Sequence, residues 1–194
     1  MLDWILTMKP IEIVAQVIGV FAAFFGIFSF QQKSRGAILI WQIINNVLWT
    51  LHMLLLGALA GGLLNAIGIF RGIVFYFRAD RKWAQSNAWY AVFCLLFAAA
   101  SGLSWIMGDG ALALLPMLGM FFTTVSLAEK DPFRVRLLSF FSSPCWLTYN
   151  VIKGSIPGVC TETFLIISIT VGILRLDLPR LRRKKSDSVD LPKE

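Results

Sequence analysis

The chain has 194 residues, of which 57% are apolar and only 15% are charged, and its mean hydropathy is +0.72. A water-soluble domain of this length cannot bury that much apolar surface, so the composition excludes a soluble globular protein. The net charge of +7 does not indicate a nucleic-acid partner, because the basic residues lie between the apolar runs rather than on one soluble segment.

Seven apolar runs are each long enough to cross a bilayer, which takes about 20 residues of helix. The first run follows Lys9 and lacks a signal-peptide cleavage site, so we expect it to remain as a transmembrane helix. Glycine turns, such as those at Gly57 and Gly154, are typical of antiparallel neighbouring helices. We therefore predict an all-α membrane protein with spans over residues 12–31, 36–56, 58–77, 87–107, 110–128, 135–153 and 156–175.

Positive charge is distributed unevenly between the connections of these spans. If the spans alternate in direction, one side of the membrane receives thirteen Lys and Arg residues, counting the tail cluster at 180–185, and the other receives only Lys9 and Lys153. Because basic connections stay in the cytoplasm, we expect a periplasmic N-terminus and a cytoplasmic C-terminus. The basic tail, residues 178–194, is expected to be disordered, either as an orientation anchor or as a contact for anionic lipid.

The first three spans resemble the last three. A shift of 97 positions, without a gap, aligns Trp49 with Trp146 and Gly57 with Gly154. Because tryptophans and turn glycines rarely match by chance in an apolar sequence, we predict two parallel three-helix repeats joined by a linker helix. The predicted boundaries are 1–79 for the first repeat, 80–109 for the linker and fourth helix, and 110–177 for the second repeat.

Several stretches resemble a known family. They are SFQQKSR from Ser29 to Arg35, NVLWTLH from Asn46 to His52, LLGA at 55–58 with GGLLN at 61–65, and CWLTYN at 145–150 with Glu162. Together they resemble the bacterial inner-membrane family called YgjV over nearly the whole chain. The resemblance implies a multi-pass protein of the bacterial inner membrane, and it implies no particular substrate.

The predicted arrangement is also similar to that of the SWEET and semiSWEET sugar transporters. Those proteins carry a tryptophan on the second helix of each triplet and an asparagine on the third. Here Trp49 and Asn65 are 16 residues apart, and so are Trp146 and Glu162. The similarity implies a transporter or facilitator of a sugar-like or other small polar solute that works by alternating access. Glu162 departs from the pattern, because it stands where the second asparagine would be.

Polar and aromatic side chains form a stripe on the second span of each predicted triplet. Facing indoles with a few convergent polar groups match a small-molecule pocket. The alternatives are hydrogen bonds that hold the helices together and tryptophans at the membrane interface. The predicted substrate-binding residues are Asn46, Trp49, Asn65, Trp146, Tyr149, Asn150 and Glu162.

Three titratable side chains within the spans suggest a gate or a charge pair. Arg71 and Glu162 come from corresponding helices, and pairing across a central cavity would neutralise both. The alternatives are a static ion pair and an arginine that extends to the interface. His52 lies near the outer end of its helix, where it can serve as a gate, a structural hydrogen-bond partner or a proton relay.

Other classes of function have less support in the sequence. We expect no catalytic residues, metal or cofactor, because the single histidine is not part of a metal-ligand cluster or a catalytic triad. The three cysteines lie within apolar runs and are expected to be free. The expected partners are the lipid bilayer and a small solute, and a homo-oligomer stays open. The alternative function is a non-transporting accessory or scaffold protein whose polar stripes bind the helices of a partner.

Overall fold

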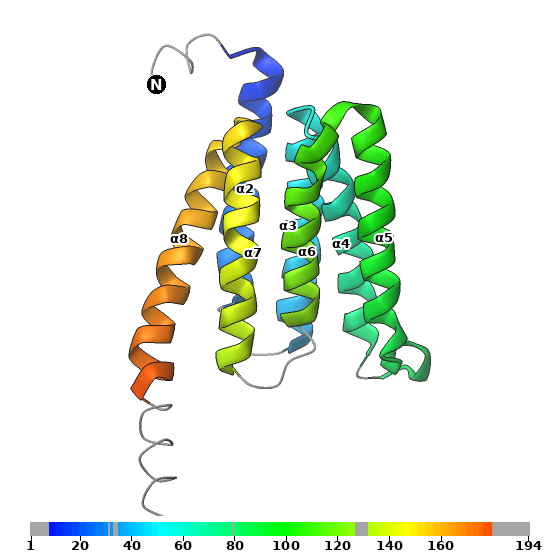
Figure 1. The fold of residues 1–194 in the computed structure, drawn as a ribbon, viewed down its shortest axis with the longest axis vertical. Coiled ribbons are helices and arrows are strands. Elements are labelled where there is room, and N and C mark those ends of the chain that lie inside the picture. Colours follow the sequence, from blue (N-terminus) through cyan, green and yellow to red (C-terminus); the bar gives the residue numbers. More distant parts are fainter. Residues whose placement is uncertain (1–7, 31, 33–34, 79, 127–131, 180–194) are drawn as a thin grey trace, which may run out of the picture.

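The computed structural model describes residues 8–30, 32, 35–78, 80–126 and 132–179, and their regular elements are all helical (Figure 1). The all-α prediction is therefore confirmed. The long helices are α2 (Pro10–Phe30), α3 (Arg35–Leu55), α4 (Leu59–Phe77), α5 (Ala88–Ser104), α6 (Leu114–Ser126), α7 (Pro132–Ile152) and α8 (Ile156–Gly172). The shorter elements are the 3-10 helices η1 (Lys82–Gln85) and η3 (Gly110–Ala113) and the π-helical segments η2 (Trp105–Asp109) and η4 (Ile173–Asp177). The tail from residue 180 onward lies outside the described residues.

Four helical stretches are long and apolar enough to cross a membrane: Pro10–Ser29, Leu59–Phe77, Ala88–Ser126 and Ile156–Arg175. The third of these is folded in two, because α5 and α6 run in opposite directions on either side of the α5–α6 connection (Figure 1). In α3 the apolar part is shorter and covers Leu39–Leu55. A multi-pass membrane protein is thus established by length and composition, and the number of seven crossings stays a prediction.

The helices α3 and α7 end in the same way. Gly57 and Gly154 have φ angles of 68° and 69°, a left-handed conformation that glycine adopts without a steric penalty. Just beyond each glycine, a backbone N–H donates to a carbonyl five residues earlier, which is the long bond of a Schellman motif. The two bonds run from Ala58 to Met53, at 2.8 Å, and from Ser155 to Asn150, at 2.9 Å. Both turns lead directly into the next helix.

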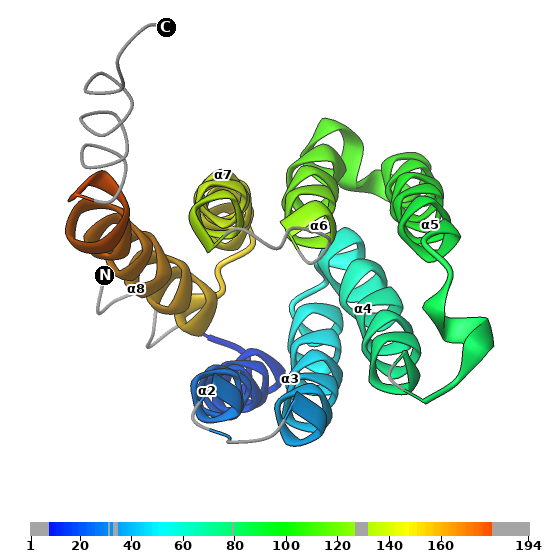
Figure 2. The ribbon, with the colours of Figure 1, turned by 90° about the horizontal axis from the view of Figure 1, so that it is seen from below.

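The long helices are arranged as two triplets with α5 beside them (Figure 2). In the first triplet, α2–α4, the helix α3 lies between α2 and α4, and in the second triplet, α6–α8, the helix α7 lies between α6 and α8. The triplets meet where α2 contacts α8 and where α4 contacts α6. The first helix of each triplet therefore packs against the third helix of the other.

The two ends of the bundle carry different connections. One end, uppermost in Figure 1, holds the α3–α4, α5–α6 and α7–α8 connections and is called the Asp109 end. The other end holds η1 and is called the Arg136 end. There Arg136, near the start of α7, donates two hydrogen bonds to the buried carboxylate of Asp177, at 2.7 and 2.8 Å. This paired contact holds the end of α8 against α7.

Two apolar clusters fill the bundle. One lies among α4, α5 and α6 and includes Leu64, Phe97 and Met120. The other lies at the Asp109 end, between the triplets, and includes Met53 and Tyr149. Large apolar side chains also point outward from α2 and α8, where a membrane would place lipid. Examples with 58–59% exposure are Val20, Phe24, Phe164 and Ile167.

Candidate functional site

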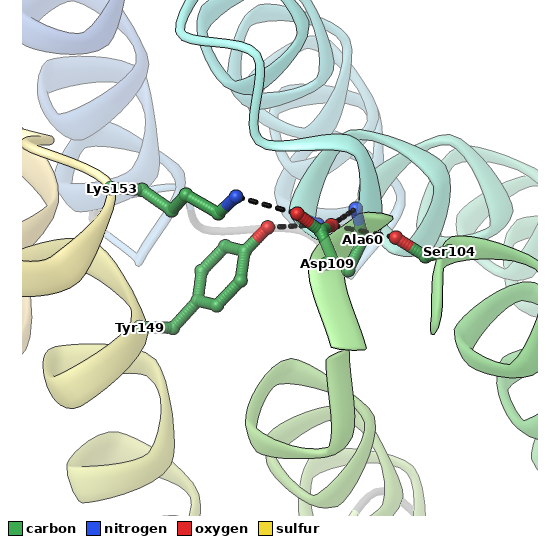
Figure 3. Close-up of polar contacts among 6 residues, drawn as sticks. Ala60, Ser104, Asp109, Tyr149 and Lys153 are labelled. Atoms are coloured by element: carbon green, nitrogen blue, oxygen red, sulfur yellow. Dashed lines mark hydrogen bonds and ion pairs between the residues drawn. The ribbon is translucent and has the colours of Figure 1, made fainter. Parts of the chain in front are cut away.

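Asp109 joins three helices at the Asp109 end (Figure 3). Its Oδ1 accepts a hydrogen bond from Lys153 Nζ, at 2.5 Å, just beyond the end of α7. Its Oδ2 accepts from Ser104 Oγ, at 2.6 Å, and from the backbone N–H of Ala60, at 2.8 Å, in the first turn of α4. A carboxylate at this position also interacts favourably with the dipole of α4. The α5–α6 connection thereby ties the end of α7 to the start of α4.

The network keeps the Asp109 carboxyl ionised. Burial raises its pKa, but the hydrogen bonds from Lys153, Ser104 and Ala60, together with the charge of Lys153, lower that pKa more, so it lies below its ordinary value. The side chains of Asp109 and Lys153 are 6% and 19% exposed, so water screens this ion pair less than a surface pair. Loss of one partner would leave the other charge partly buried and unpaired.

Tyr149 makes a second contact between the triplets, next to Asp109 (Figure 3). Its hydroxyl accepts a hydrogen bond from the backbone N–H of Gly61 at 2.9 Å, and its side chain is fully buried. The two residues approach closely because Gly61 has no side chain: a Cβ atom there would lie 2.8 Å from Cε1 of Tyr149. The glycine is therefore required for this helix contact.

His52 makes a third contact between the triplets. Its Nδ1 lies 2.6 Å from the carbonyl oxygen of Ala15, which can only accept, so Nδ1 carries the hydrogen. In the neutral ring Nε2 then accepts from Ser155 Oγ, at 2.6 Å. Ser155 is the N-cap of α8, and its Oγ also accepts from the N–H of Gly158. The fully buried His52 therefore links α2, α3 and the start of α8.

Gln16 of α2 holds the α7–α8 turn with both ends of its amide. Its Nε2 donates to the carbonyl of Gly154 at 2.8 Å, and its Oε1 accepts from the N–H of Ile156 at 3.1 Å. A pocket of about 310 Å³ opens beside this contact, between Gln16, Gly57 and Lys153. This pocket lies at the Asp109 end of the bundle, and none of the predicted substrate-binding residues lines it.

Three of the predicted substrate residues come together between the triplets. Trp49 and Trp146 pack against the apolar cluster that contains Met53 and Tyr149. The ring of Trp49 meets that of His52 edge to face at 5.2 Å, and the ring of Trp146 meets that of Tyr149 in the same way at 6.1 Å. The two tryptophans therefore line the same region between α3 and α7, directly below the polar contacts of the Asp109 end.

The polar members of the predicted site do not converge on one point. The amide groups of Asn46 and Asn65 donate to carbonyls of their own helices, at Gln42 and Gly61. The buried Asn150 has an Oδ1 atom without a hydrogen-bond partner within the described part of the chain. Asn46 and Asn65 are thus already bonded within their own helices, and a ligand that binds these amide N–H groups would have to break those hydrogen bonds.

Arg71 and Glu162 do not contact each other among the described residues, and their role as a gate or a charge pair stays a prediction. Arg71 donates to Thr124 Oγ1 on α6 at 2.7 Å, whereas Glu162 lies on α8. The reason is the packing of the helices, since α4 lies against α3, α5 and α6 but α8 lies against α7 and α2. The two residues lie on corresponding helices, but these helices have different neighbours and do not place the two side chains face to face.

Sequence reasoning missed Asp109, Lys153, Ser155 and Gly61 as functional candidates. Two of them had a usable signal: Ser155 lies two residues before Pro157, as an N-cap does, and Asp109 stands between two glycines at a helix junction. Lys153 and Gly61 had no such signal, because their contacts join segments that are distant along the chain.

Comparison with known proteins places the chain in a family. Neither the curated proteins nor the solved structures gave a match. A family model described as a bacterial inner membrane protein, Imp-YgjV, matches residues 13–180 and so includes nearly all of the helical region. This match confirms the resemblance to the YgjV family, and the similarity to the SWEET transporters stays a prediction. The chain belongs to the Imp-YgjV family of bacterial inner membrane proteins.

Proposed function

We propose that this protein crosses the inner membrane seven times and carries a small polar solute by alternating access between its two triplets. The observation that carries the proposal is the position of the polar contacts between triplets. Those of Lys153 with Asp109, Tyr149 with Gly61 and His52 with Ser155 all lie at the Asp109 end. Below them lie Trp49 and Trp146, the aromatic pair of the predicted solute site. In a transporter, such contacts between the triplets would close the solute path at the Asp109 end.

Seven crossings are supported by the environment of the two least apolar helices. The polar side chains of α3 and α7 contact neighbouring helices: Asn45 donates to the carbonyl of Ala22, and Ser142 donates to the carbonyl of Gly119. A helix with a polar stripe can cross a bilayer when other helices cover that stripe. The central position of α3 and α7 in their triplets provides this cover.

The same contacts support the repeat. Asn45 and Ser142 are 97 positions apart, and so are the residues whose carbonyls accept their hydrogen bonds, Ala22 and Gly119. The glycines of the two matching turns keep the same spacing and nearly the same φ. Two units of similar geometry that meet along two equivalent contacts, α2 with α8 and α4 with α6, can rock against each other.

The charge distribution supports the orientation of the closed end. Thirteen basic residues lie at the predicted cytoplasmic connections and in the tail cluster at 180–185, whereas the Asp109 end carries Lys9 and Lys153. The positive-inside rule then places the Asp109 end in the periplasm. In the proposed orientation, a path between the triplets would be closed toward the periplasm by these contacts, and its opening would require Lys153 to leave Asp109.

Uptake by the purified full chain in liposomes tests this proposal. We expect uptake of at least one labelled solute among sugars, amino acids, nucleosides and organic acids, above that of protein-free liposomes. The variants Trp146→Ala, Asn65→Ala and Glu162→Ala should lose most of this uptake and keep a cooperative thermal unfolding transition. Trp105→Ala is the matched control, because Trp105 is 47% exposed and lies outside the contact between the triplets.

Two results would contradict the proposal. Normal uptake by the Trp146→Ala and Asn65→Ala variants would show that the solute does not pass the predicted site. No uptake of any class, together with a stoichiometric partner protein that co-purifies from the membrane, would favour the accessory or scaffold function instead.

A further inference from the structure

Arg71 is a buried cation whose neighbours are neutral. It lies on α4 with 8% of its surface exposed, and Nη1 donates to Thr124 Oγ1 on α6 at 2.7 Å. Its guanidinium carbon lies 5.8 Å from the centre of the Phe97 ring on α5. In the part of the chain that the structure describes, no carboxylate pairs with it and no other group accepts its remaining N–H groups. The guanidinium therefore keeps an uncompensated charge and free donors.

Two other basic side chains of the bundle each contact a buried carboxylate and so differ from Arg71. Arg136 pairs with Asp177, and Lys153 pairs with Asp109. A charge inside a membrane protein is costly unless an opposite charge accompanies it, and such residues commonly mark a solute or ion pathway. The neutral surroundings of Arg71 thus suggest that its negative partner is not part of the described chain.

A second unsatisfied group lies on the neighbouring helix. Ser101 is 2% exposed, and its hydroxyl has no hydrogen-bond partner within the described residues. It follows Phe97 by one turn, on the same buried face of α5. A buried hydroxyl without a partner is also unfavourable. Arg71 and Ser101 therefore present unused donors from two helices that pack against each other.

We infer that α4, α5 and α6 hold a small organic anion with one carboxylate group, bound by Arg71 and Ser101 beside the Phe97 ring. The inference rests on the proposed transport function and names its class of solute. A planar guanidinium matches a carboxylate, and one positive charge balances one negative charge. The second charge of a phosphate ester would lack a cation in the described surroundings, and a neutral sugar would leave the charge of Arg71 uncompensated.

The surroundings of Arg71 also connect this site with the predicted solute path. Gly68 precedes Arg71 by one turn, and a Cβ atom there would lie 3.0 Å from Oδ1 of Asn46 and 3.3 Å from Cε of Met120. The site thus adjoins Asn46, one of the predicted substrate residues, and the apolar side chain of Met120 can contact the organic part of the anion. It also lies where α4 meets α6, so binding there involves both triplets.

Thermal unfolding of the delipidated full chain in a neutral detergent tests the site directly. Sodium propionate and sodium benzoate are compared with propionamide and benzamide, which have nearly the same shape without the charge, at constant ionic strength. We expect the two carboxylates to raise the Tm of the wild type by several degrees and the amides to leave it unchanged. The control Arg81→Gln removes an exposed arginine and should keep the full carboxylate effect.

The variants separate a binding role from a structural one. Arg71→Gln should lose the carboxylate effect, and without ligand its Tm should equal or exceed that of the wild type, because an uncompensated buried charge is removed. Ser101→Ala should fold normally and show a smaller carboxylate effect, which keeps the test decisive if Arg71→Gln does not fold. The inference is overturned if carboxylates stabilise Arg71→Gln as much as the wild type, if amides act equally, or if only added phosphatidylglycerol raises the Tm.

The transport assay distinguishes failure of this inference from failure of the proposed function. Uptake of a neutral solute that Arg71→Gln leaves unchanged would overturn the carboxylate site while transport stands. Carboxylate binding to the wild type, lost in Arg71→Gln, without uptake of any solute would support the site and contradict transport.

Discussion

At the scale of single residues, Gly61 sets how closely α4 approaches α7. An added Cβ would lie 2.8 Å from Tyr149 and 3.1 Å from the sulfur of Met53, so Gly61→Ala must displace a buried ring. We expect this variant to lose about 1–3 kcal/mol of stability, as overpacked cores do. Gly102→Ala is the matched control, since nothing lies within 4 Å of the added atom in α5, and it should gain about 0.5–1 kcal/mol. Thermal unfolding in detergent compares the two, and equal effects would contradict the close contact.

The ion pair of Asp109 predicts a dependence of stability on pH. Because the pKa of Asp109 is lower in the folded protein, the pair contributes stability that is fully present above the ordinary pKa of the carboxyl, 3.8, and is lost as the pH falls through the folded value. Asp109→Asn should therefore have a lower Tm than the wild type at pH 7, and the difference should shrink below about pH 4. Asp80→Asn, which changes an exposed carboxyl, should show no such difference, and a gap at pH 3 as large as that at pH 7 would contradict the ionic origin.

At the scale of the element, the start of α8 depends on Ser155. The hydroxyl caps the helix and also serves His52, so Ser155→Ala removes two hydrogen bonds at once. Loss of an N-cap costs about 0.5–2 kcal/mol, and an unpaired buried imidazole nitrogen adds about 1–3 kcal/mol. Thr163→Ala, in the same helix but exposed, should change stability by less than about 0.5 kcal/mol. Unfolding measurements that give the two variants equal stability would show that Ser155 does not anchor α8.

At the scale of the whole molecule, the proposed topology predicts which ends react from outside the cell. A cysteine at Ala111, exposed in η3, should react with a membrane-impermeant maleimide in spheroplasts, whereas one at Gln85, exposed in η1, should react only after lysis. A reporter protein that functions only in the cytoplasm should be active when it is fused to the C-terminus. The reverse labelling pattern would place the Asp109 end in the cytoplasm, and labelling of both sites from outside would contradict the crossing of α5.

The helices and their turns could be predicted from the sequence because they depend on residues that are close together along the chain. An apolar run of sufficient length must form a helix in lipid, where backbone groups have no other partner, and Gly57 and Gly154 end α3 and α7 because their left-handed conformation favours glycine. The family was also visible in short stretches, and the match over residues 13–180 bears this out. The two tryptophans of the candidate site, Trp49 and Trp146, stood out in the sequence because they are 97 positions apart, as Gly57 and Gly154 are.

The polar part of the site was decided by tertiary structure alone. Arg71 and Glu162 lie on corresponding helices, yet α4 packs between α3, α5 and α6 while α8 packs against α7 and α2, so the two charges have different neighbours. Likewise, Lys153 forms an ion pair with Asp109, which lies 44 positions earlier in the chain. Hydropathy and charge asymmetry act on each segment separately, and they determine which segments are helical and how they are expected to lie across the membrane. Hydrogen bonds and ion pairs need atoms within about 3–4 Å, so they depend on which helices become neighbours, and only the folded bundle determines that.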